Sequence, residues 1–195
     1  MIAIVDYDAG NIKSVMNALR RIGAEFELSA DPGSIRTASK VILPGVGNAA
    51  EAMNSLRNKG LVDVIKGLRK PVLGICVGMQ LMCRHSEEGD AECMGLFDCD
   101  VCRFSCEPDV KVPHMGWNSI SNLDSKLFKS IDEGSFVYFV HSYYPGLCTD
   151  TIATCRHGKT LFSAALKYEN FYGTQFHPEK SGGIGEKILE NFLAL

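Results

Sequence analysis

The sequence predicts a single α/β domain whose largely parallel central sheet carries a small antiparallel insertion. Short apolar segments alternate with helical patterns through the first half of the chain, which is typical of parallel β-α-β units. The second half consists instead of strand-like segments joined by short turns. No internal repeat, low-complexity tract or linker divides the 195 residues, so we expect residues 1–195 to form one domain.

The first half supplies four expected strands and the helices between them. Val15, Leu19 and Ile22 share one face of an expected helix, and Gly23 stands just past its end. Asp31-Pro32-Gly33 opens the connection between the second and third strands. In chain order, we expect a strand at 2–5, a helix at about 11–22, strands at 25–28 and 40–43, helices at 49–56 and 61–68, and a strand at 72–75.

The second half begins with a helix-compatible stretch at 79–83 and then becomes rich in strands. Apolar runs separated by turn residues favour strands over helices in this region. The expected strands are 96–104, 137–140, 151–154, 161–166 and 171–175, and a last helix is expected at 184–193.

Composition excludes several classes of function. A net charge of −3 argues against a dedicated nucleic-acid-binding protein. No apolar run approaches the ~18 residues of a membrane helix, and the first apolar run ends at Asp6, which does not suit a signal peptide. Eight cysteines in a chain of this length indicate reduced thiols rather than a disulfide framework, so we expect a cytoplasmic protein.

Residues 71–80, PVLGICVGMQ, carry the clearest functional signal in the chain. A strand, a sharp turn and a helix form the setting in which G-x-S-x-G places a nucleophile on a strained elbow, and here Cys76 stands at the apex. Gly74 and Gly78 remove Cβ atoms where strand and helix crowd each other. Unpaired N–H groups at the helix start favour a thiolate. We predict that Cys76 is a nucleophile; the alternative is a buried structural cysteine.

A second segment that suits this chemistry is Pro44-Gly45-Val46-Gly47, directly after the strand at 40–43. In an open α/β sheet, function collects at the carboxyl ends of the strands, where the strand at 72–75 also ends. Two glycines around one residue make a flexible turn whose N–H groups can point at a bound oxygen, as an oxyanion hole requires. The alternative is an ordinary turn before a helix.

Phe176-His177-Pro178-Glu179 supplies a candidate base. Proline disfavours the α conformation for the residue before it, so His177 is expected in extended chain. Residues i and i+2 of an extended chain face the same side, which would bring His177 and Glu179 together. A carboxylate holding one imidazole nitrogen leaves the other nitrogen to take a proton from Cys76.

The elbow motif and the F-H-P-E segment together resemble the triad class, or class I, of glutamine amidotransferases, which share a three-layer α/β/α fold. Further segments resemble the branch that provides the glutaminase subunit of imidazole glycerol phosphate synthase. Those segments are DYDAGN at 6–11, PGVG at 44–47, PHMGWN at 113–118, YFVHSY at 138–143 and PEKSG at 178–182.

The resemblance implies hydrolysis of glutamine to glutamate and ammonia through a thioester on Cys76, with His177 and Glu179 completing the triad. The implied oxyanion hole is formed by N–H groups of Gly45, Val46, Gly47 and Val77. The implied glutamine-binding residues are Gly47, Gln80, Glu88, Ser142 and Tyr143. Glu87 stands beside Glu88 in a loop without clear register, so either could occupy that position.

Ammonia chemistry implies a partner protein. Ammonia freed into neutral water is mostly ammonium, and one domain of this size has no room for a second active site. The resemblance implies a (β/α)8-barrel cyclase subunit that uses the ammonia to form imidazole glycerol phosphate and AICAR in histidine biosynthesis, with no cofactor. The positions that match its interface are Asn11, Trp117, Tyr138 and Lys180. For Trp117, the alternative is an ordinary buried aromatic residue.

A cysteine-rich window at 93–106 raises the question of a zinc site, because Cys99 and Cys102 form a C-x-x-C pair. Structural zinc requires a tight turn between such cysteines. The window instead reads as a strand, in which residues three apart face opposite sides. We therefore expect core or surface thiols here and no metal.

Three other functions remain open from the sequence. A paralogue could feed ammonia to a different synthase, such as one modifying a surface sugar. A catalytically silent scaffolding subunit is disfavoured by the intact Cys76, His177 and Glu179. A cysteine peptidase on a related fold would leave Gln80 and residues 113–118 without a role.

Overall fold

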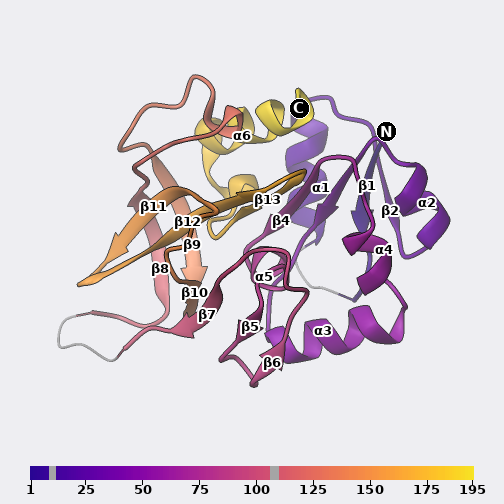
Figure 1. The fold of residues 1–195 in the computed structure, drawn as a ribbon. Coiled ribbons are helices and arrows are strands. Elements are labelled where there is room, and N and C mark those ends of the chain that lie inside the picture. Colours follow the sequence, from indigo (N-terminus) through magenta and orange to yellow (C-terminus); the bar gives the residue numbers. More distant parts are fainter. Residues whose placement is uncertain (9–11, 106–109) are drawn as a thin grey trace.

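A seven-stranded sheet forms the centre of the computed structural model, which describes residues 1–8, 12–105 and 110–195 (Figure 1). The strand order is β11-β12-β13-β4-β3-β1-β2. The five strands from β13 to β2 run parallel, whereas β11 and β12 continue the sheet antiparallel. These strands are β1 (Ile2–Val5), β2 (Phe26–Ser29), β3 (Lys40–Leu43), β4 (Val72–Ile75), β11 (Thr151–His157), β12 (Thr160–Tyr168) and β13 (Phe171–Thr174).

Helices cover both faces of this sheet, with α1 and α6 on one side and α3 and α4 on the other (Figure 1). They are α1 (Ile12–Arg21), α2 (Pro32–Thr37), α3 (Ala49–Asn58), α4 (Val62–Lys66), α5 (Val77–Gln80) and α6 (Gly182–Leu193), with short 3-10 turns η1 (Lys126–Phe128) and η2 (Pro178–Lys180). The expected three-layer α/β/α arrangement is confirmed. Within the described ranges, no helix is long and apolar enough to cross a membrane.

Two small sheets supplement the central one. The first has the order β10-β7-β5-β6, and the second is a two-stranded antiparallel ribbon of β8 and β9. Their strands are β5 (His85–Ser86), β6 (Ala91–Glu92), β7 (Asp100–Arg103), β8 (His114–Ser119), β9 (Phe136–His141) and β10 (Tyr143–Pro145). The small antiparallel insertion is therefore present, with its strands divided between these sheets and the edge of the main sheet.

Most strand predictions hold, and the exceptions have physical reasons. The expected strand at 96–104 is wrong at its start, because only 100–103 pairs as β7. The short helix α2 was not predicted from Asp31-Pro32-Gly33. The Asp31 carboxylate accepts a hydrogen bond from the Ser34 N–H at 2.7 Å, and Pro32 occupies the first helical position, so these residues start a helix.

The core explains why the parallel strands read as continuous apolar runs. All four residues of β1, of β4 and of β13 are buried. Strands covered on both faces lack the alternation of half-exposed strands. Since β3, β4 and β13 are neighbours and parallel, their carboxyl ends meet at one edge, which we call the elbow edge. Pro44, Cys76 and Gln175 follow these three strands there.

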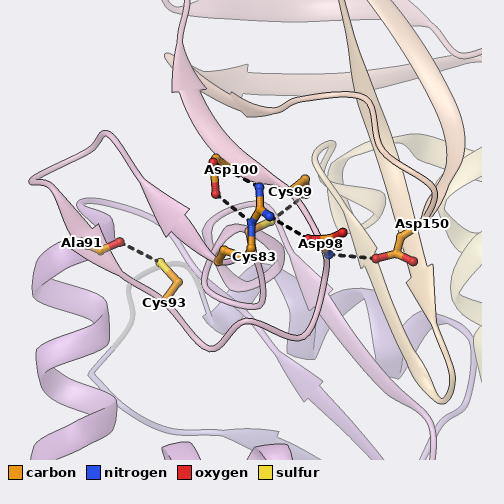
Figure 2. A network of polar contacts seen from close by, with 8 residues as sticks. Cys83, Ala91, Cys93, Asp98, Cys99, Asp100 and Asp150 are labelled. Atoms are coloured by element: carbon orange, nitrogen blue, oxygen red, sulfur yellow. Dashed lines mark hydrogen bonds and ion pairs between the residues drawn. The ribbon is translucent and has the colours of Figure 1, made fainter.

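The cysteine-rich window packs as separate thiols (Figure 2). Cys99 is buried with its Sγ 3.6 Å from Cys83 Sγ, while Cys93 bonds the Ala91 carbonyl. The seven cysteines in the described ranges are free, and no group of three His, Cys, Asp or Glu residues there could hold a metal ion. Cys106 lies outside the described residues. Cys102 is half-buried on β7.

Candidate active site

Cys76 occupies a strained turn between β4 and α5. Its φ of 53° and ψ of −112° are rare for a residue with a side chain, and such strain persists only where the surroundings enforce it. The Cys76 N–H donates to the Thr174 carbonyl at 2.7 Å, which fixes the turn to β13. Because α5 is only one turn long, the sulfur gains little from a helix macrodipole, and the nearby N–H groups are the local source of positive potential.

Three glycines allow the backbones at the elbow edge to touch. A Cβ on Gly74 would lie 2.7 Å from the Gly78 carbonyl oxygen. A Cβ on Gly78 would overlap the Leu43 carbonyl, and one on Gly45 would lie 2.9 Å from the Tyr7 hydroxyl. The close approach of β3, β4 and α5 thus depends on the absence of side chains, as the elbow motif indicated.

His177 and Glu179 form a buried pair. Their Nδ1 and Oε1 atoms are 2.8 Å apart, and each side chain is 1% exposed. His177 is extended, as the following proline predicts, and its N–H bonds the Tyr138 carbonyl. The predicted cause of the pairing is wrong, however. Pro178–Lys180 forms the 3-10 turn η2, and this turn, rather than continuous extended chain, brings the carboxylate to the imidazole.

The electrostatics of His177 favour a charged imidazole. Burial alone lowers the pKa of His177, but the neighbouring Cys76 sulfur and the Glu179 carboxylate together raise it to about 10. Its Nε2 is buried and makes no hydrogen bond of regular geometry within the described residues. An imidazolium held beside Cys76 stabilises a thiolate and can later deliver a proton to a leaving group.

A cavity of about 190 Å³ opens beside the sulfur. It is smaller than the roughly 300–1,000 Å³ typical of sites for drug-sized ligands, so it suits a ligand of amino-acid size. Several predicted site residues line it: Val46, Gly47, Cys76, Val77, Gln80, Glu88, Ser142, Tyr143 and His177. Gly45, by contrast, does not line this cavity.

The candidate oxyanion segment, residues 44–47, is held in place by a hydrogen bond and by backbone contacts. The Tyr7 hydroxyl, which is buried, donates to the Pro44 carbonyl at 2.5 Å. Gly45 packs against the backbone of Val77 and Gly78, while Gly47 adopts a φ of 92° that favours glycine. This segment therefore joins the elbow through backbone contacts, with Val46, Gly47 and Val77 facing the cavity.

Gln80 connects the elbow to the start of β10. Its Nε2 donates to the Tyr143 carbonyl and to Gln175 Oε1, both at 2.9 Å. The Ser142 carbonyl accepts the Phe104 N–H at 3.0 Å. Both carbonyl groups of Ser142 and Tyr143 are thus already engaged within the protein.

Glu87 and Glu88 lie in different surroundings. Glu87 Oε2 accepts the Arg103 N–H at 2.7 Å, away from the cavity lining. Glu88 lines the cavity, and its Oε2 accepts the Ala49 N–H at 2.9 Å. Burial raises the pKa of Glu88, and the bond from Ala49 opposes part of that shift.

Two of the predicted interface residues lie on the β8–β9 ribbon, and a third lies beside it in η2. Trp117 and Tyr138 are cross-strand partners with ring centroids 6.1 Å apart, and Lys180 Nζ lies 5.9 Å from the Tyr138 ring centroid. Trp117 is 55% exposed, which excludes the alternative of a buried aromatic residue. The fourth predicted residue, Asn11, lies outside the described residues.

Sequence reasoning missed several residues of this region. Val140 and His141 line the cavity, and Gln175 contacts both Cys76 and Gln80. Met115 and Phe136 extend the exposed apolar surface around Trp117. A period-two interpretation of 175–177 would have placed Gln175 on the same side as His177, but the other positions depend on tertiary contacts.

Comparisons with known proteins identify the family of the chain. The chain matches the family model "Glutamine amidotransferase class-I" over residues 3–195. A Bacteroides thetaiotaomicron protein named imidazole glycerol phosphate synthase subunit HisH is 55% identical over 195 residues, covering 100% of this chain and 99% of the relative. A protein of the same name from Shewanella sediminis is 49% identical, covering 98% and 89% respectively.

Solved structures share the fold at low sequence identity. PurLQS from Thermotoga maritima matches with a TM-score of 0.70 and 19% identity, covering 99% of this chain and 97% of that one. The CTPS glutaminase domain of Trypanosoma brucei matches with a TM-score of 0.65 and 16% identity, covering 99% and 93%. At these identities the likeness concerns the fold alone. The family model and the curated relatives carry the assignment: the chain belongs to the class I glutamine amidotransferases.

Proposed function

We propose that this chain is the glutaminase subunit of imidazole glycerol phosphate synthase, which supplies ammonia in histidine biosynthesis. Relatives that carry this name are 55% and 49% identical over nearly the whole chain. The structural observation that supports the proposal best is the buried His177–Glu179 pair beside Cys76, at a cavity of amino-acid size. The chain is an enzyme that hydrolyses glutamine.

The first half of the reaction forms a thioester. The Cys76 thiolate attacks the side-chain carboxamide carbon of glutamine, and the N–H groups of Val46, Gly47 and Val77 stabilise the oxyanion. The His177 imidazolium gives its proton to the departing nitrogen, so that ammonia leaves as the C–N bond breaks. Glu179 keeps the imidazole in the tautomer and orientation that this transfer needs.

The second half regenerates the enzyme. His177, now neutral, takes a proton from water while the water oxygen attacks the thioester carbon. Glutamate leaves and the thiolate returns beside the imidazolium. Gln80 and Glu88 contact the amino-acid end of the substrate, and Gly47, Ser142 and Tyr143 contribute backbone groups around it. The carboxylate of Glu88 suits the substrate's α-ammonium group.

The ammonia is consumed by a partner subunit. We infer a (β/α)8-barrel cyclase that docks on a surface of Met115, Trp117, Phe136, Tyr138 and Lys180, hereafter the docking face. Met115, Trp117 and Phe136 are each more than half exposed. Exposed apolar residues gathered on one ribbon are typical of an interaction site, and tryptophan is enriched among binding hot spots. The two subunits would form a cytoplasmic heterodimer.

The test uses the Cys76→Ala variant in complex with the barrel cyclase. Glutamine-dependent product formation should fall to background, because no thioester can form. Product formation from added ammonium salt at high pH should persist, because the cyclase needs only free ammonia. Retained glutamine hydrolysis would contradict the mechanism. Activity with another synthase, but not with this cyclase, would identify the chain as a paralogous ammonia supplier.

A further inference from the structure

We propose that Gln175 is a positioning residue of this glutaminase, whose side-chain amide holds the Cys76 sulfur at one end and the Gln80 amide at the other. The inference rests on the proposed function and extends it to a residue outside the triad. Gln175 directly follows β13 and is completely buried. Its N–H donates to the Ala164 carbonyl at 2.8 Å, which anchors it to β12.

Two contacts place the Gln175 side chain in the site. Its Nε2 lies 3.6 Å from Cys76 Sγ, within hydrogen-bond range for sulfur. Its Oε1 accepts from Gln80 Nε2 at 2.9 Å. Gln175 thus contacts both the nucleophile Cys76 and Gln80, a residue of the cavity wall. It also stands only two residues before the base His177 in the chain, so the backbone ties the positions of the two side chains together.

The direction of these hydrogen bonds is fixed by groups that cannot change roles. The Tyr143 carbonyl can only accept, so Gln80 must turn its NH₂ toward it. The second hydrogen of that NH₂ goes to Gln175, which must present its oxygen there. The Gln175 NH₂ is then committed to the sulfur. For Gln80, the same pattern leaves its oxygen, rather than its nitrogen, to meet a donor on the ligand.

The chemistry at the sulfur explains why such a donor matters. Cys76 Sγ also lies 3.9 Å from the Val140 carbonyl, a group that can only accept and therefore suits a neutral thiol. Gln175 Nε2 can only donate, so it suits the thiolate. A buried charge needs hydrogen-bond partners as well as an opposite charge. Gln175 supplies one such partner, separate from His177.

Two variants separate the function of the Gln175 NH₂ group from that of its Oε1 atom. Gln175→Glu is nearly isosteric and retains an acceptor for Gln80, but an ionised carboxylate cannot donate to the sulfur. Gln175→Leu removes both contacts. A matched control is Asn191→Leu on α6, because Asn191 is also a buried amide, which donates to the Leu127 and Lys129 carbonyls, and it does not line the cavity.

The primary measurement is the rate at which iodoacetamide alkylates Cys76 as a function of pH, followed by mass spectrometry of the peptide that contains it. In the full-length chain, the pH of half-maximal alkylation should rise by about one unit or more in both Gln175 variants. In Asn191→Leu it should match the parent. Unchanged profiles in both Gln175 variants, or an equal rise in the control, would overturn the inference.

Steady-state glutamine hydrolysis in the synthase complex gives the second measurement. Gln175→Glu should lower kcat by about tenfold or more with KM near the parent value, since Gln80 keeps its partner. Gln175→Leu should lower kcat and also raise KM. Equal effects on KM in the two variants would contradict the assigned roles. Because alkylation requires no synthase, its outcome is independent of whether the proposed partner is correct.

Discussion

The elbow edge and the docking face border the same site, yet they are built in opposite ways. Cys76, His177 and Glu179 are each at most 6% exposed, and around them backbone packs directly on backbone. On the docking face, Trp117 is 55% exposed and contacts Tyr138 across the ribbon. The first region is completed by the fold itself, whereas the second leaves apolar area in water. Substitutions should therefore damage stability in one region and association in the other.

The most disruptive test of this contrast is Gly78→Ala at the elbow edge. The added methyl group would overlap the Leu43 carbonyl, so β3 or α5 must move. We expect a loss of about 3 kcal/mol or more in the free energy of unfolding, together with the loss of glutamine hydrolysis. Urea unfolding followed by circular dichroism measures the first quantity.

Gly183→Ala provides the matched control, because nothing lies within 4 Å of its added Cβ in α6. Replacing a helical glycine by alanine there should be neutral or stabilise the protein by up to about 1 kcal/mol. Comparable destabilisation by both variants would show that the close backbone packing at the elbow has no special importance.

The same contrast describes what could be predicted from the sequence. The elbow edge was predictable because its determinants are local: apolar runs for β3 and β4, glycines that flank Cys76, and a proline that fixes the conformation of His177. The Glu179 contact was also predicted, although the turn that creates it was not. Short-range sterics leave clear traces in a sequence.

The ribbon was only partly predictable. β9 was expected, but its partner β8 was not, because HMGWNS shows no apolar alternation. In β8 the buried residue is polar: His114 is 5% exposed and its Nδ1 lies 2.9 Å from His141 Nε2. That burial is compensated by a hydrogen bond to a residue 27 positions away. The exposed surface of Trp117 likewise depends on which face of the ribbon packs inward.

A smaller effect is expected at the docking face. Trp117→Ala should weaken association with the barrel cyclase by about 2 kcal/mol, or roughly 30-fold, because large aromatic residues dominate binding energy. Lys180→Ala should cost only about 0–1 kcal/mol in affinity, as is usual for an exposed charge, but should lower the amount of product formed per glutamate. Neither variant should change the urea unfolding of the isolated chain by more than about 0.5 kcal/mol.

Isothermal titration calorimetry gives the affinities, and parallel assays of glutamate and product give the coupling ratio. Ser119→Ala serves as a control that removes little surface. Ser119 is the last residue of β8 and pairs with Phe136 of β9. If Trp117→Ala binds normally while Ser119→Ala does not, the docking face has been placed on the wrong part of the ribbon.

The last test concerns the histidines that join the two regions. Burial, together with the nearby His157, lowers the pKa of His114 to about 4 and that of His141 to about 3. Both values lie below the unfolded value of roughly 6.5, so the unfolded chain binds more protons between these limits. The free energy of unfolding should therefore have its full value above about pH 6.5 and should decrease as the pH falls toward 4.

Urea unfolding at pH 7, 6 and 5 tests whether the free energy of unfolding falls with pH as expected. The parent should lose up to about 1.4 kcal/mol per pH unit for each of the two histidines, and His114→Gln should show a shallower dependence. His177 does not interfere, because its raised pKa contributes stability that is fully present below about pH 6.5 and is lost only as the pH rises toward 10. If His114→Gln keeps the parental slope, the buried histidine pair is not what couples stability to acid, and the ribbon is joined to the elbow edge by packing alone.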